Sequence, residues 1–171
     1  MARGLVLLGM LLLLPGSAWT LEWGNVEPGV TTQSEVRSRY GAPTKETSAK
    51  VEGYDTVQWI YDEPQAPDGM YRMTIDFGLL TPAGYRPSTV RLLKLEPKPG
   101  IFTRNTIVDG WGVPDSVGAQ EGVSTAFYRE GLFVVLDKEG NSAVTMIFSP
   151  PQPEEGTKGA TPSPPPPLQK K

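Results

Sequence analysis

The sequence feature that most constrains the fold is an internal repeat. Residues 28–43 recur in register as residues 99–114, with Pro, Gly, Thr, Gly and Pro at matching places. An aromatic residue precedes the second glycine in both copies. Self-similarity of this kind is typical of a duplicated structural unit. We therefore expect two copies of one small unit, which share an interface because units of this size are marginally stable alone.

Each copy begins with the pattern of a short helix. Thr32 is a favourable N-cap residue, and Glu35 three positions later completes a capping box. Val36 and Tyr40 lie one turn apart on one face, and Gly41 suits the C-terminal end of a helix. The second copy has the same roles filled by Thr103, Ile107, Trp111, Gly112 and Pro114. The pattern predicts two short helices that depend on packing, because isolated helices of this length are not stable.

Strand patterns follow each helix. Alternating apolar and polar residues predict three strands in each copy, over residues 56–62, 70–78 and 88–96 and then 125–129, 132–137 and 143–148. Residues 62–69 and 79–87 are rich in Pro and Gly and are expected to be loops. The predicted fold class is therefore α+β. We expect two tandem units, each with a short helix or helix pair packed on a three- to four-stranded antiparallel sheet.

Composition divides the chain into regions of different character. Arg3, an apolar run from Leu5 to Leu14 and the small residues that follow are typical of a secretory signal peptide, with an uncleaved anchor as the alternative. Proline dominates the C-terminal residues, which favours a disordered or polyproline II tail acting as a spacer or as a ligand for an aromatic-lined groove. The expected organisation is a signal peptide (1–20), a first unit (21–97), a second unit (98–149) and a proline-rich tail (150–171).

The residue types that are missing restrict the chemistry. The sequence contains no cysteine and no histidine, which removes thiolate nucleophiles, the commonest metal ligand and the commonest general base. Without cysteine, a lipid anchor on that residue is also excluded. The net charge of −3 shows no basic excess, so we expect no nucleic-acid partner. Asp62, Glu63 and Asp68 lack the spacing of a calcium loop, and we predict no metal, no cofactor and no enzymatic activity.

Several of these residues together resemble a known domain family. Gly29, Thr31 or Thr32, Val36, Gly41 and Pro43 are similar to the SmpA/OmlA (BamE-like) family, as is the hairpin over residues 133–141. Two such units in tandem resemble the β-lactamase-inhibitor-like superfamily, and the likeness covers roughly residues 24–149. The resemblance implies a non-enzymatic, exported protein-binding module of the bacterial cell envelope, either periplasmic or associated with the outer membrane, with secretion also open. Two hypotheses remain beside this accessory or scaffold: an inhibitor of a hydrolase, and a carboxylate-based enzyme.

The candidate binding residues are aromatic. Tyr54 and Tyr85 fall in expected loops and should be exposed, whereas Trp59 and Tyr61 lie on a strand and could face either the core or a partner. Tyrosine and tryptophan dominate the energetics of protein interfaces when they are exposed. We therefore predict that Tyr54, Trp59, Tyr61 and Tyr85 contact a protein partner. The core is expected to hold Tyr40, Tyr71, Met73, Ile75, Phe77 and Trp111.

Overall fold

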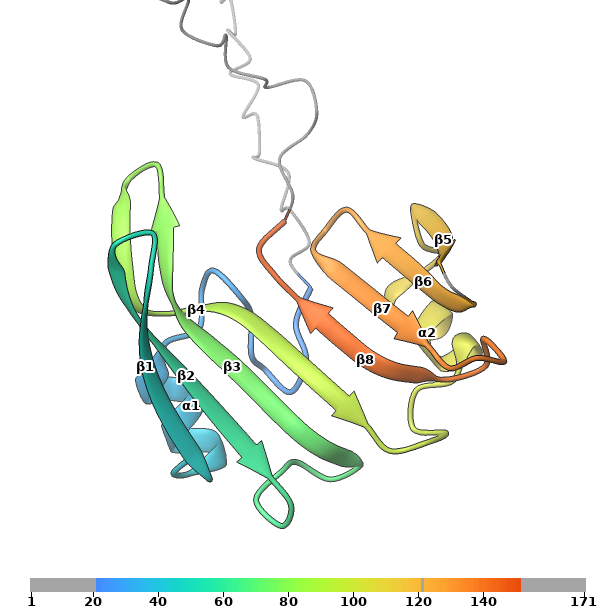
Figure 1. Ribbon diagram of the computed structural model, residues 1–171, viewed down its shortest axis with the longest axis horizontal. Helices are drawn as coiled ribbons and strands as arrows, with labels where there is room; N and C mark the ends of the chain where they lie inside the picture. Colours follow the sequence, from blue (N-terminus) through green and yellow to red (C-terminus); the bar gives the residue numbers. More distant parts are fainter. Residues whose placement is uncertain (1–20, 121, 152–171) are drawn as a thin grey trace, which may run out of the picture.

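A computed structural model describes residues 21–120 and 122–151 of the chain (Figure 1). The expected signal peptide and nearly all of the proline-rich tail lie outside the described residues. All eight strands form one antiparallel sheet in the order β1-β2-β3-β4-β8-β7-β6-β5. The elements are α1 (Gln33–Tyr40), β1 (Lys45–Val51), β2 (Tyr54–Asp62), β3 (Met70–Thr81), β4 (Gly84–Pro97), α2 (Arg104–Trp111), β5 (Ser116–Gln120), β6 (Val123–Tyr128), β7 (Leu132–Leu136) and β8 (Ala143–Phe148).

The expectation of two tandem helix-on-sheet units was wrong. The structure is mostly a single eight-stranded sheet with two short helices, because β4 pairs with β8 and joins the strands of both halves. Leu93 lies opposite Phe148 and Leu95 opposite Met146, and all four side chains are fully buried. Two separate sheets would leave β4 and β8 as unpaired edges carrying apolar side chains, which is unfavourable. Continuous pairing satisfies the backbone and the core together.

The core lies on one side of this sheet. Both helices are behind the sheet in Figure 1, and Val36 of α1 and Ile107 of α2 are buried against it. A row of buried residues on this side crosses six strands, in the sheet order β2, β3, β4, β8, β7 and β6. The row consists of Trp59, Ile75, Leu93, Phe148, Leu132 and Tyr128. The helix-covered side therefore forms one continuous hydrophobic core from end to end.

The two predicted helices are confirmed, and so is the predicted capping box at the start of α1. The backbone N–H of Thr32 donates to Glu35 Oε2 at 2.7 Å, and this bond lowers the pKa of the Glu35 carboxyl. The hydroxyl of Tyr61 donates to the carbonyl of Gly41 at 3.2 Å, just after α1. Tyr128 donates in the same way to Gly112 at 3.1 Å, just after α2. Each helix is thus fastened to the sheet through the glycine that ends it.

The strand prediction missed both edges of the sheet. No strand was expected at β1 or β5. The described side chains of both strands are all exposed, so neither strand has an alternation of buried and exposed residues that would have indicated it. The expected loop over residues 79–87 was also wrong, because β3 and β4 continue through it and pair until Thr81 meets Gly84. Tyr71 is half exposed instead of buried, since an irregularity between Met70 and Arg72 shifts the register of β3.

Burial of Tyr61 predicts a loss of stability at alkaline pH. Burial raises the pKa of the Tyr61 phenol to about 12, above the value of about 10 for an unfolded chain. The folded state therefore holds this proton more tightly, so its contribution to stability is complete below pH 10 and is lost as the pH rises from about 10 to 12. Replacing Tyr61 with phenylalanine should flatten the fall of the unfolding free energy over this range. Urea unfolding at several pH values measures this free energy. If Tyr61→Phe leaves its pH dependence unchanged, the raised pKa does not belong to Tyr61.

Candidate functional site

The candidate site is the face of the sheet that neither described helix covers, called here the open face (Figure 1). Side chains alternate between the two faces of a strand, so the residues next to buried ones point to the open face. The pairing register aligns one row of such residues across all eight strands: Lys45, Ile60, Thr74, Lys94, Ile147, Phe133, Phe127 and Ser116. This row begins with polar and charged residues and becomes apolar towards β6.

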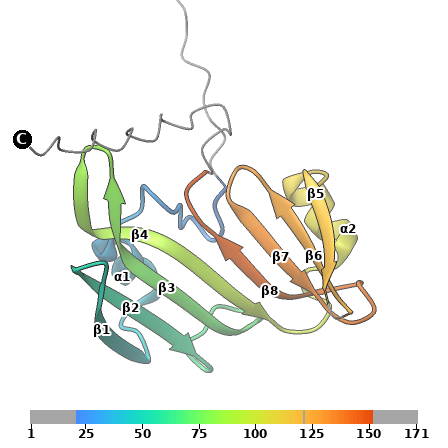
Figure 2. The ribbon, with the colours of Figure 1, turned by 45° about the horizontal axis from the view of Figure 1, so that its top comes forward.

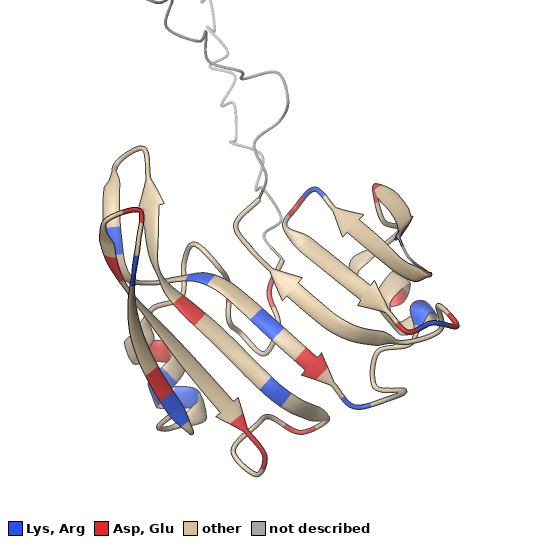
Figure 3. Ribbon diagram, viewed as in Figure 1, with Lys and Arg blue, Asp and Glu red and all other residues tan. Residues whose placement is uncertain are grey.

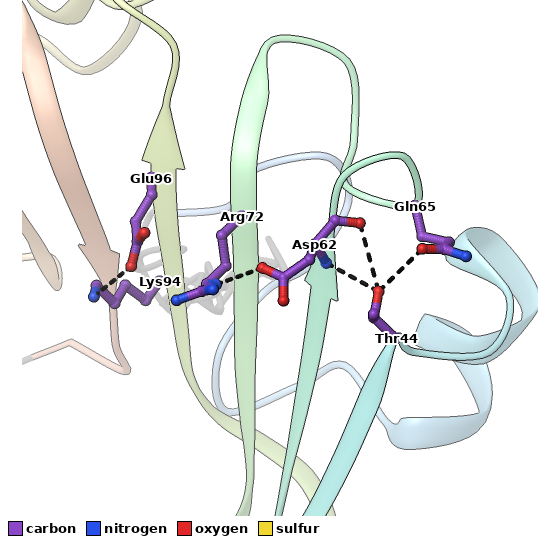
Figure 4. A network of polar contacts seen from close by, with 6 residues as sticks. All are labelled: Thr44, Asp62, Gln65, Arg72, Lys94 and Glu96. Carbon is purple, nitrogen blue, oxygen red and sulfur yellow. Dashed lines mark hydrogen bonds and ion pairs between the residues drawn. The ribbon is translucent and has the colours of Figure 1, made fainter.

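Paired charges occupy the part of the open face formed by β2, β3 and β4 (Figure 3). Arg72 Nε lies 2.5 Å from Asp62 Oδ1, and Lys94 Nζ lies 2.7 Å from Glu96 Oε1 (Figure 4). The hydrogen bond that Arg72 donates to Asp62 raises the pKa of the Arg72 guanidinium, which stays charged. Because these pairs are partly exposed to water, they contribute little to stability. The pairs mainly give this surface a fixed pattern of charge.

The strand end beside these pairs is tied to the loop over residues 62–69. The hydroxyl of Thr44 accepts a hydrogen bond from the Asp62 backbone N–H at 3.0 Å and donates to Gln65 Oε1 at 3.2 Å (Figure 4). Asp62 is therefore held through its backbone while its carboxylate pairs with Arg72. This loop remains a loop, as the sequence predicts.

A third charged group lies further along the same strands. The carboxylate of Asp76 accepts a hydrogen bond from Gln58 Nε2 at 2.8 Å and lies 3.4 Å from Arg91 Nη2. Arg91 Nε is buried and has no hydrogen-bond partner among the described residues. Because Nε is buried, a binding partner cannot reach it, and only the contact of Nη2 with Asp76 belongs to the open surface.

The other half of the open face is apolar. Phe127, Phe133, Val135 and Ile147 come from three adjacent strands and are all partly exposed. The residues of β6, β7 and β8 that share this face include no charged side chain. The open face therefore presents an apolar field next to a field of paired charges.

Tyr54 and Tyr85 come together at the far end of the same face. Their rings stack with centroids 4.6 Å apart, and the Tyr85 hydroxyl donates to the Asp55 carbonyl. They line a shallow pocket with Arg91 and Leu80. Gly78 makes this arrangement possible, because a side chain there would overlap the Tyr85 hydroxyl. Both tyrosines lie on strands rather than in the expected loops, and Tyr54 is the more exposed.

Trp59 and Tyr61 point to the opposite side of the sheet. Both are buried against α1, where Trp59 packs edge-on against Phe77 at 4.8 Å and lies under the Arg37 guanidinium at 4.9 Å. The structure thus brings only two of the four predicted binding residues onto one surface. Sequence reasoning missed Phe127, Phe133 and Ile147. Both faces of β7 are apolar. The sequence therefore indicates this region only by an apolar run that lacks the alternation expected of a strand with one solvent-exposed face.

Comparison with known proteins adds little to this geometry. No family model matches the chain, and no curated protein matches it. One solved structure is similar, a DUF4309 family protein (YjgB) from Bacillus subtilis subsp. subtilis str. 168. The TM-score is 0.46 at 10% identity, over 74% of this chain and 83% of that one, and this likeness carries no argument about function. The resemblance to the SmpA/OmlA family stays a prediction.

The described part of the open face brings together apolar side chains and paired charges. The described residues contain no cluster of three acidic side chains that could hold a metal ion. The acids of the open face, Asp62, Asp76 and Glu96, are each paired with a lysine or arginine. Neither described helix is long and apolar enough to cross a bilayer. The chemistry available on this surface is contact between apolar side chains and fixed, paired charges.

Proposed function

We propose that the chain is an exported, non-enzymatic binding protein of the bacterial cell envelope, an accessory or scaffold that docks a folded protein on its open face. The observation that carries the proposal is an eight-stranded sheet covered by helices on one side only, with a partly exposed apolar field on the other. Protein interfaces combine an apolar centre with a polar rim, and the two fields of the open face supply both.

The charge pattern favours a protein as the partner. The open face carries four cations (Lys45, Arg72, Arg91 and Lys94) and three anions (Asp62, Asp76 and Glu96), so neither sign is in large excess. A nucleic acid would require an excess of positive charge, whereas a protein surface can present both signs.

Support for export and for the envelope comes from the sequence. Arg3 and the apolar run from Leu5 to Leu14 have the character of a signal peptide, and the resemblance to envelope proteins favours that compartment. The hydrolase-inhibitor hypothesis gains one observation. The β3–β4 hairpin projects beyond the sheet in Figure 1, and Leu80 near its tip is half exposed. Inhibitors commonly block enzymes with a protruding loop of this kind.

Affinity capture from an envelope extract tests the proposal and separates the two modes. The bait is the full chain with a C-terminal tag, beside Phe127→Arg on the open face and Leu80→Arg on the hairpin. We expect envelope proteins to be captured and Phe127→Arg to reduce their recovery at least tenfold, because a charge replaces an apolar contact. Leu80→Arg, at the far end of the open face, should reduce recovery much less than Phe127→Arg.

The alternative outcomes are distinct. Capture of a single hydrolase that Leu80→Arg abolishes would replace the scaffold proposal with the inhibitor hypothesis. Recovery that neither substitution changes would exclude the open face. Both substituted side chains are exposed, so circular dichroism should show that the fold is intact.

A further inference from the structure

The two edges of the sheet differ in how they are protected. β1 carries Lys45, Glu46 and Lys50 along its seven exposed residues. Charged residues on an edge strand oppose pairing with another chain, so β1 is a protected edge. β5 has the sequence Ser-Val-Gly-Ala-Gln, which contains no charge and no proline. No other described strand pairs with the outer edge of β5, so an additional strand can pair there.

An apolar groove lies beside this unprotected edge. It has a volume of about 220 Å³ and lies between α2 and the end of the sheet. Its lining residues include Ile107, Val108, Val113, Val117, Ala126 and Tyr128. Val113 is 81% exposed and Val117 is 65% exposed. Because Val117 belongs to β5 and Val113 to the turn before it, the groove opens at the edge of the sheet, on the helix-covered side. Figure 2 shows α2 next to β5 and β6 at this edge.

The groove exists because a large side chain is missing beneath α2. Tyr61 and Tyr128 make the same hydrogen bond to the glycine that follows each helix, so their surroundings can be compared. Two residues before Tyr61 stands Trp59, whose indole is buried beside α1. Two residues before Tyr128 stands Ala126. The space that an indole occupies at α1 is therefore left unfilled at α2.

We propose that the β5 edge binds an extended, uncharged peptide segment of another protein by strand addition, with one large apolar side chain of that segment in the groove. In this mode backbone hydrogen bonds give affinity and pockets for alternate side chains give specificity. Val117 is in register with Ala126 and faces the groove, so the neighbouring side chain of an added strand points to the same side. This surface is separate from the open face.

A second copy of the chain fits this edge less well. A five-residue strand is about 17 Å long, which is short for an interface in which each partner buries about 800 Å². In an antiparallel self-pairing the groove would receive only valine and alanine side chains from the partner's β5. The groove is wide enough for a larger group. An unrelated segment with leucine, phenylalanine or tryptophan fills it better.

Titration of the ¹⁵N-labelled chain with a synthetic peptide tests the proposal. The probe is a blocked peptide of alternating threonine and leucine, seven residues long, with a lysine at each end for solubility. We expect saturable shifts of amide signals confined to β5, α2 and the turn between them. Val117→Lys should weaken binding at least tenfold, and so should Ala126→Trp, which fills the groove without adding charge. The matched control is Ser48→Lys on the exposed β1 edge, which should bind like the unchanged chain.

Four results would overturn the proposal. They are no shifts up to millimolar peptide, shifts on the open face or on β1, binding by Val117→Lys and Ala126→Trp as tight as that of the unchanged chain, and a dimer in sedimentation that Val117→Lys dissociates. The last would show that the occupant is a second copy. Two variants with different chemistry guard against the failure of one to fold. The sites of Val117→Lys and Ser48→Lys are both exposed, and amide spectra report their folding directly.

Discussion

Replacing Phe148 with alanine should lower the free energy of unfolding by about 3–5 kcal/mol, because a fully buried aromatic ring is lost and a cavity remains. Phe148 lies between Leu93 of β4 and Leu132 of β7, so it contributes to the core of both halves of the sheet. Its ring also packs edge-on against Trp111 of α2, with centroids 5.9 Å apart.

Urea unfolding followed by tryptophan fluorescence and circular dichroism measures this loss. The matched control is Val144→Ala on the same strand, whose side chain is 45% exposed and should cost under about 1 kcal/mol. We also expect one cooperative transition by both probes, because β4 and β8 join the two halves. A loss for Phe148→Ala no larger than that for Val144→Ala would contradict the central position of β8.

Replacing Gly131 with alanine should cost about 2–4 kcal/mol. Its φ of 111° lies in a region that favours glycine, and a methyl group there would overlap the carbonyl oxygen of Ser149. That clash is with backbone rather than with a movable side chain. It would also disturb the hydrogen bond from the Ser149 N–H to the Gly131 carbonyl at 2.8 Å, which fixes the chain after β8.

Gly112→Ala separates the two causes. Gly112 has a φ of 80°, but a methyl group there would meet no other atom within 4 Å. Only the backbone strain remains, at φ 80° and ψ −170°, so the expected cost is about 1–3 kcal/mol and smaller than that of Gly131→Ala. Thermal or urea unfolding of the two variants side by side gives the difference. Equal losses of unfolding free energy in the two variants would show that the overlap with Ser149 does not add to the cost of a side chain at position 131.

Local features of the fold could be predicted from the sequence. Thr32 and Glu35 define the start of α1, and the glycines at 41 and 112 mark the helix ends, because these signals depend on residues close together in the chain. The single sheet could not be predicted in this way. The pairing of Leu93 with Phe148 joins distant segments, and alternation within one strand does not identify its partner. The exposed strands β1 and β5 gave no pattern at all.

The candidate site shows the same division. Tyr54 and Tyr85 were identified as binding residues, and the structure brings them together on the open face. Trp59 and Tyr61 were assigned to the same role, yet a strand with aromatic residues on one face does not reveal which face the helix covers. Phe127 and Phe133 were missed because their exposure depends on neighbouring strands and on the position of α2.

The order of the strands also determines when the sheet can be completed. β8 is the last described strand in the sequence but lies in the middle of the sheet, between β4 and β7. A chain emerging from its N-terminus therefore has both neighbours of β8 before it has β8 itself. Until Ala143–Phe148 is available, two apolar strand edges stay unpaired, and such edges promote aggregation. A nascent chain of this protein should need shielding by a chaperone until nearly all of the described sequence has been released.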